Sequence, residues 1–190
     1  MMKSRLKLLF ATFLSTGLLC STLHGAGPTT TALAGRVTVE FPSAPKKEVR
    51  TVDTKYGTIK FVSFKSRAPG VFLNLLITTF PASVIRSTKD PVAFMERTAT
   101  GNEKQKRGAK RVYFRELKES NQWAAEHRFT YPSGKNSTGA HYAVGFAIHR
   151  YHLVDTSMVT VFVDVLDGMY QKQSEMIDKQ IADFFSSLEI

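Results

Sequence analysis

The fold of this chain is decided by the stretch AHYAVGFAIHRYHLVDTSMVTVFVDVL, at residues 140–166. It contains two apolar segments, Ala140–Leu153 and Met158–Leu166, on either side of the polar turn residues Asp155-Thr156. Runs of β-branched and aromatic residues on both sides of a short turn are typical of an antiparallel hairpin. The stretch therefore predicts two paired strands, and the neighbouring sequence indicates how they are extended into a sheet.

Upstream segments supply the further strands. Val71–Phe80 is apolar at nearly every position, which predicts a central strand covered on both faces. Other strands are expected at Arg36–Phe41, Glu48–Lys55, Thr58–Ser66, Arg111–Glu116 and Trp123–Tyr131. The second and third of these are predicted to form a hairpin that turns at Tyr56-Gly57.

Two helices are predicted from capping and periodicity. Asp90-Pro91 is a helix start, since Asp caps the first turn and Pro is favoured at the first helical position. This helix is expected to end at Gly101 or Gly108. The closing segment has an apolar stripe at helical spacing, formed by Ile177, Ile181, Phe184, Phe185 and Leu188. Because strands come in runs separated by helices, the predicted class is α+β, a twisted antiparallel β-sheet with helices packed on its faces.

Two short motifs are similar to a known family. They are VTVEFPSAP at Val37–Pro45 and the closing ADFFSSLEI at Ala182–Ile190. With the order of the elements, they resemble secreted bacterial proteins with a PsbP-like fold, named after the extrinsic subunit of photosystem II and shared by a Ran-binding nuclear import factor family. The resemblance covers residues 36–190 and implies a twisted antiparallel sheet between helices. No cluster here matches a metal site of the photosynthetic protein, so the resemblance implies no functional residue.

The chain begins with the pattern of a secretory signal peptide. Three basic residues precede a short apolar run, and small and polar residues follow at 21–31. We therefore expect a signal peptide at 1–26, a flexible spacer at 27–35 and a single PsbP-like α+β domain at 36–190. The product is expected to be exported to the periplasm or the extracellular space, with no transmembrane segment in the mature chain.

The cleavage point has two candidates in the sequence. One lies at Gly25 or Ala26, close to the apolar run, and the other follows Ala32-Leu33-Ala34, which has small residues at the required spacing. The lone cysteine, Cys20, lies within the apolar run and has no small residue before it, so lipid attachment is not expected. Either cleavage leaves a mature chain without thiol or disulfide chemistry.

The charge of the chain favours an acidic partner. The formal net charge is +10, and it falls to +7 when Lys3, Arg5 and Lys7 leave with the leader. Such a charge suits an envelope protein or an anionic envelope surface, and nothing indicates a specific nucleic acid. The alternative is that the charge serves solubility alone. The predicted polyanion-binding strip comprises Lys104, Lys106, Arg107, Lys110, Arg111 and Arg115. The alternative is a solvated helix end and an edge strand that cations protect from aggregation.

No catalytic or metal-binding group is predicted. His141 and His149 share a strand face but lie roughly 26 Å apart at strand rise, and His152 points to the opposite face. His127, among aromatic residues, is expected to be a hydrogen-bonded core histidine. Asp164 lies in an apolar strand, where a carboxyl has a raised pKa unless it is paired. The favoured interpretation is an Asp at a strand end, partly solvated or salt-bridged to a nearby Arg. We therefore expect no metal and no cofactor.

The function predicted from these observations is a non-enzymatic accessory or interaction module of the cell envelope. One alternative is a carrier for a lipid or another apolar ligand. It rests on the small residues Ala143, Gly145 and Ala147, which leave room for a pocket or for the rings of Phe184 and Phe185. A hydrolase that uses Asp164 is the remaining alternative.

Overall fold

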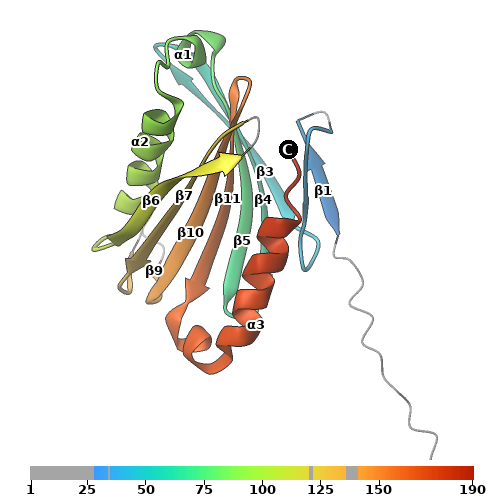
Figure 1. Cartoon of the computed structure of the whole chain (residues 1–190), viewed down its shortest axis with the longest axis vertical. Coiled ribbons are helices and arrows are strands. Elements are labelled where there is room, and N and C mark those ends of the chain that lie inside the picture. Colours follow the sequence, from blue (N-terminus) through green and yellow to red (C-terminus); the bar gives the residue numbers. More distant parts are fainter. Residues whose placement is uncertain (1–27, 34, 120–121, 136–140) are drawn as a thin grey trace, which may run out of the picture.

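A seven-stranded antiparallel sheet dominates the structure, in the strand order β3-β4-β5-β11-β10-β7-β6 (Figure 1). The structure is a computed structural model that describes residues 28–33, 35–119, 122–135 and 141–190. The strands of the large sheet are β3 (Lys46–Thr54), β4 (Gly57–Ala68), β5 (Val71–Thr79), β6 (Lys110–Glu119), β7 (Gln122–Tyr131), β10 (Gly145–Val154) and β11 (Ser157–Leu166). The helices are α1 (Ala82–Arg86), α2 (Pro91–Lys104) and α3 (Asp167–Ser186).

The predicted central hairpin is confirmed as β10 and β11. Their register runs without a break from Gly145↔Leu166 to Val154↔Ser157, and the chain turns at Asp155, whose φ is +50°. The first strand begins at Gly145 rather than at Ala140. The two-residue strand β9 (His141–Tyr142) lies before it and pairs instead with β8 (Gly134–Lys135).

One face of the sheet is covered by α3. Alternate residues of β5 and β11 point toward this helix and form the largest apolar cluster, together with Phe146 of β10. The helix contributes Ile177, Ile181, Phe184 and Phe185, which confirms the stripe predicted from its sequence. Burial of side chains of this size is the main contribution to the stability of such a domain.

The opposite face is only partly covered, by α2. This helix lies at the β6 end of the sheet (Figure 1) and buries Met95 and Ala99 against Ala125, Tyr151 and Met158. The prediction that Val71–Phe80 is covered on both faces is therefore right only in part for the α2 side. Among the β5 side chains that face away from α3, Thr78 is buried, whereas Phe72, Asn74 and Leu76 are half-buried. Sequence periodicity shows that a strand is apolar but does not show where a distant helix is placed.

The segment predicted as a flexible spacer contains a strand. Residues Thr29–Ala32 form β1, which pairs with β2 (Val37–Glu40) over four residue pairs. This hairpin lies beside α3 (Figure 1) and shares an apolar cluster with it, and Thr38 pairs with Glu189 beyond the end of the helix. A Thr-rich sequence resembles a linker in composition, but its β-branched side chains suit a strand once a partner strand is available.

Other boundaries differ by a few residues. The turn between β3 and β4 is Lys55-Tyr56, one residue earlier than predicted. The helix that starts at Asp90 ends at Lys104 between the two predicted glycines, and Ala93 N donates to Asp90 Oδ1 at 2.9 Å as the cap. The predicted signal peptide lies outside the described residues.

Candidate polyanion-binding surfaces

The predicted basic strip does not form one surface, because its members point to both faces of the sheet. Strand neighbours alternate in direction, and a β-bulge between Arg111 and Tyr113 shifts the register of β6. Arg111 therefore lies on the α2 side, opposite Phe129, whereas Arg115 lies on the α3 side, opposite Glu126.

Arg111 joins α2 to the edge strand β6. Its guanidinium donates to Glu96 Oε1 and to Thr100 Oγ1, both at 2.6 Å, and to Glu103 Oε2 at 3.2 Å. Two carboxylates and a hydroxyl thus take its donors. Its role is to hold the helix against the sheet rather than to bind an external anion.

Arg115 belongs to a cluster around a buried carboxylate. Glu126 is only 3% exposed and accepts from Arg115 and Arg150 at 2.6 and 2.8 Å and from the Tyr113 hydroxyl at 2.8 Å. Burial alone would raise the pKa of Glu126, but the hydrogen bonds from Arg150, Tyr113 and Arg115 outweigh burial and hold that pKa below its ordinary value. Arg115 is therefore paired, although its own side chain is 60% exposed.

Lys106 lies beside Asp164. Its ammonium is 3.5 Å from Asp164 Oδ1 and 4.3 Å from the centre of the Tyr131 ring, and the Tyr131 hydroxyl is 3.4 Å from the same carboxyl oxygen. Burial raises the pKa of Asp164 above its ordinary value, although Lys106 and Tyr131 oppose this rise. The strip members Lys104, Arg107 and Lys110 lie on the exposed surface around the end of α2 and the start of β6.

The β3–β4 hairpin carries a larger excess of positive charge. Between Lys46 and Ala68 the sequence has seven basic and two acidic residues, a net charge of +5 out of +10 for the whole chain. The basic residues are Lys46, Lys47, Arg50, Lys55, Lys60, Lys65 and Arg67. Glu48 pairs with Lys65 and Lys46 at 2.5 and 3.2 Å, while Asp53 accepts from the Thr58 hydroxyl at 2.6 Å.

Basic side chains of this hairpin lie over aromatic rings of the neighbouring strand. Arg50 lies 5.0 Å from the Phe61 ring on the α2 side, and Lys47 lies 5.6 Å from the Phe64 ring on the α3 side. Arg67 lies 4.9 Å from the Phe72 ring across β4 and β5. A cation over an aromatic face is held in place while its remaining donors face solvent. The sequence analysis predicted this hairpin but not its excess of basic residues. Counting basic and acidic residues in each predicted element would have shown that excess.

His127 and His149 are buried on the α2 side of the sheet. His127 is 0% exposed, which confirms the predicted core position, but the prediction that it is hydrogen-bonded is not confirmed: its Nε2 lies 3.3 Å from Glu103 Oε2 without the geometry of a hydrogen bond. His149 Nδ1 is 3.2 Å from the Tyr151 hydroxyl, which accepts from Asn102 Nδ2. Burial lowers the pKa of His149 well below its ordinary value, so this imidazole is neutral at pH 7. Within the described ranges no group of three His, Cys, Asp or Glu side chains is arranged to hold a metal ion.

The space beside the small residues of β10 is filled from the sheet itself. Ala147 is buried against Phe129 and Tyr131, on the face opposite Phe184 and Phe185, so the suggestion that these two rings fill it is wrong. At Gly145 a Cβ atom would lie 2.0 Å from the Val165 carbonyl oxygen, which explains the glycine. Neither position therefore opens onto an apolar cavity.

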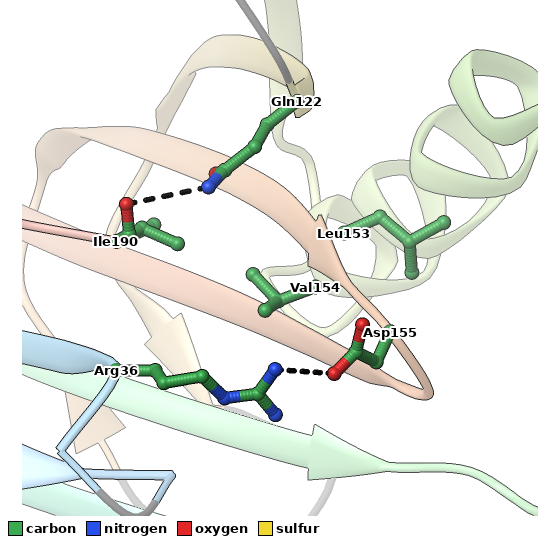
Figure 2. A pocket seen from close by; sticks show the side chains of 6 residues that line it. All are labelled: Arg36, Gln122, Leu153, Val154, Asp155 and Ile190. Carbon is green, nitrogen blue, oxygen red and sulfur yellow. Dashed lines mark hydrogen bonds and ion pairs between the residues drawn. The ribbon is translucent and has the colours of Figure 1, made fainter.

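A pocket of about 410 Å³ lies where the β1–β2 hairpin, β7 and the β10–β11 turn meet (Figure 2). Its polar groups pair with each other: Arg36 with Asp155, and Gln122 Nε2 with the Ile190 carbonyl at 3.3 Å. Leu153 and Val154 form part of its apolar lining. These two contacts connect four segments of the chain: Arg36 with the β10–β11 turn, and the start of β7 with the C-terminal residue.

Comparisons with known proteins find solved structures whose chains follow a similar course. No family model matches the chain, and no curated protein matches it. The solution structure of cyanobacterial PsbP (CyanoP) from Synechocystis sp. PCC 6803 is similar, with 14% identity over 90% of this chain and 96% of that chain and a TM-score of 0.49. The crystal structure of PA94 from Pseudomonas aeruginosa, described as a putative regulator, is 8% identical over 83% of this chain and 94% of that chain, with a TM-score of 0.40.

One of these similar structures is a PsbP, from the family whose fold the two sequence motifs resemble. At these identities the likeness concerns the course of the chain alone, so functional conclusions rest on the residues described above. In the part of the chain that the structure describes, no helix has both the length and the apolarity needed to cross a membrane.

Proposed function

We propose that this protein is a non-enzymatic accessory module of the cell envelope that binds an acidic partner through the β3–β4 hairpin. The observation that carries the proposal is the net charge of +5 between residues 46 and 68. Clustered cations raise the local concentration of a polyanion and speed its association. The sequence-predicted strip supports the proposal less, because Lys106, Arg111 and Arg115 have carboxylate partners within the fold.

The proposal predicts salt-sensitive binding that depends on the hairpin. The protein should bind heparin and phosphatidylglycerol-containing vesicles at low salt, and binding should weaken steeply as salt rises, because exposed charges interact over only about 8 Å at physiological ionic strength. Reversal of Lys47, Lys55 and Lys60 to Glu should abolish this binding. The fold should persist, since exposed substitutions usually change stability by within about 0.5 kcal/mol each.

Two matched variants separate a site from net charge. The first reverses Lys104, Arg107 and Lys110, three exposed members of the strip that lie around the end of α2 and the start of β6. Lys106 is left out because Glu at that position would face Asp164. The second reverses Lys89, Lys172 and Lys179 elsewhere. If all three triple variants lose binding equally, only net charge matters. If the strip variant alone loses it, the site is the strip, and if the wild type does not bind at moderate salt, the proposal fails.

Export supports the same proposal from a different direction. A basic module in the periplasm or outside the cell would meet anionic lipids, polymers and acidic envelope proteins. The leader motif at residues 1–26 is the basis for this part of the proposal. Fractionation of expressing cells tests it, and recovery of the full-length chain from the cytoplasmic fraction would contradict it.

The Asp164 cluster supports a second candidate, hydrolysis. A carboxyl with a raised pKa beside an amine and a phenol could take part in proton transfer. Among the described residues, however, the partners of Asp164 are Lys106 and Tyr131, and neither is the hydroxyl or thiol nucleophile that a triad requires. Loss of ester hydrolysis in Asp164→Asn would favour this candidate over the binding module.

A further inference from the structure

In the part of the chain that the structure describes, no segment covers the outer edge of β3. β3 is the first strand of the sheet order, and its pairing partner among the described strands is β4. Eight of its nine residues are exposed and the ninth, Thr54, is intermediate. A strand in this position presents a row of backbone N–H and C=O groups that can pair with another extended chain.

The register identifies which groups face outward. The two-residue turn Lys55-Tyr56 makes Thr54 and Gly57 the closing pair, which exchanges both hydrogen bonds. Bonded and non-bonded pairs alternate along an antiparallel ladder. The backbone groups of the odd-numbered residues therefore point away from β4: Lys47, Val49, Thr51 and Asp53.

The two edges of the sheet differ in how they are protected. The opposite edge strand, β6, has a β-bulge between Arg111 and Tyr113, which interrupts the regular ladder that a docking strand needs. The register of β3 is continuous from Lys46↔Lys65 to Thr54↔Gly57, and the strand contains no proline. The feature that protects β3 from pairing with other strands is therefore its charge. Charge repels a basic strand but not an acidic one, so it selects among partners.

Cations flank the β3 edge on both faces. Lys46 and Arg50 lie on the α2 side and Lys47 on the α3 side, while the exposed apolar side chains are Val49 and Val52, which are 56% and 39% exposed. A basic strand laid beside this edge would be repelled. A strand whose acidic side chains alternate with small or β-branched ones would place carboxylates beside these cations, and opposite charges across strands stabilise a pair.

We propose that the outer edge of β3 is the docking site of an extended acidic polypeptide segment, which adds to the sheet as a further strand. This deepens the proposed function by naming the class of partner, and it rests on that function. Backbone hydrogen bonds supply the affinity of strand addition, while side chains supply the selectivity. A second copy of this chain is a less suitable occupant, because two hairpins of net charge +5 would be brought together.

Amide hydrogen exchange with a designed peptide tests the proposal. The probe is a blocked peptide as long as β3 in which Glu alternates with Thr or Val, and its control has Gln in place of Glu. We expect the Glu peptide alone to bind at moderate salt. In the complex, the amides of Lys47, Val49, Thr51 and Asp53 should gain protection, whereas the even-numbered amides of β3 are already protected in the free protein.

A matched pair of variants gives an independent readout. Thr51→Pro removes one outward N–H without removing a bond to β4, and proline is tolerated at such edge positions. It should weaken peptide binding about tenfold, whereas Thr51→Val, which keeps the N–H, should leave binding unchanged. The melting temperature of Thr51→Pro shows whether the hairpin persists. If the variant does not fold, the exchange pattern of the wild type still decides.

The outcomes separate this proposal from the proposed function. If the peptide, heparin and vesicles bind equally well and Thr51→Pro has no effect, side-chain charge alone acts and strand addition is wrong, while the binding module stands. If no polyanion binds, both fail. If the odd-numbered amides are protected without peptide in a dimer detected by light scattering, the occupant of the edge is a second copy.

Discussion

At the scale of single residues, Glu126 tests how a buried carboxylate is held. Replacing it with Gln removes the charge that faces Arg115 and Arg150, and the free energy of unfolding at pH 7 should fall by about 2–3 kcal/mol. Glu116→Gln, at an exposed position of the same edge region, should change stability by within about 0.5 kcal/mol. Urea unfolding of the three proteins gives the comparison. Equal stabilities would mean that the cluster contributes nothing.

The pH dependence of the same residue has a definite sign. The folded pKa of Glu126 lies below its unfolded value, so its stabilisation is complete above the unfolded pKa and is lost as pH falls through the folded pKa. The difference in stability between wild type and Glu126→Gln should therefore be largest at neutral pH and shrink in acid. A difference that grows toward acid would contradict the assigned direction.

Asp164 should behave in the opposite way. Its folded pKa is raised by burial, so ionisation costs stability once pH rises above the unfolded pKa. Asp164→Asn should therefore be more stable than the wild type at pH 7, and the two should converge at a pH where the wild-type carboxyl is protonated in both states. A variant less stable at pH 7 would show that the attraction to Lys106 outweighs burial.

Residue chemistry was only partly predictable from sequence. The half-buried position of Asp164 in an apolar strand follows from the local pattern, and so does the core position of His127. The partners do not, because Lys106 and Tyr131 approach Asp164 from other elements. Likewise, nothing local in Arg111 shows that Glu96 and Glu103 take its donors, since that depends on how α2 docks.

At the scale of elements, α3 should stabilise the domain through Phe184. This ring is 3% exposed and lies 5.2 Å from the Phe41 ring, so it joins the helix to the segment after β2. Phe184→Ala should lower the free energy of unfolding by about 3–5 kcal/mol. Met176→Ala, at a 39% exposed position of the same helix, is the control and should have little effect. Similar melting temperatures for both variants would mean that the helix does not pack on the sheet as described.

Elements with strong periodicity were predicted well, and those defined by tertiary contacts were not. The β10–β11 hairpin, β7 and the stripe of α3 follow from patterns within one segment. β1 was missed because its Thr-rich sequence gains strand structure only from pairing with β2. The partial exposure of the sheet face opposite α3 was not predicted for a related reason. It depends on the position of α2, which covers only one end of that face.

At the scale of the whole molecule, the strand order makes the basic hairpin an edge. Sequence predicted the β3–β4 pair and an antiparallel sheet, but the order of strands depends on which apolar faces meet in three dimensions. Only that order places β3 outside and β10–β11 near the middle. Of the formal net charge of +10 for the whole chain, +5 therefore lies at one end of the sheet, on the β3–β4 hairpin with its turn residue Lys55.

The position of β1 also bears on where the proposed signal peptide would be cleaved. Cleavage after Ala32-Leu33-Ala34 would remove Thr29–Ala32 and leave β2 without its partner strand. Cleavage near Gly25 or Ala26 would keep β1, including Thr30, which is 8% exposed. We therefore expect the intact mass of the exported protein to correspond to a start upstream of Thr29. A chain engineered to start at Gly35 should unfold at a lower temperature than one that starts at Gly27, because paired strands bury backbone hydrogen bonds that a lone strand exposes. A natural start at Gly35, or a lipid-modified Cys20 at the N-terminus, would contradict this prediction.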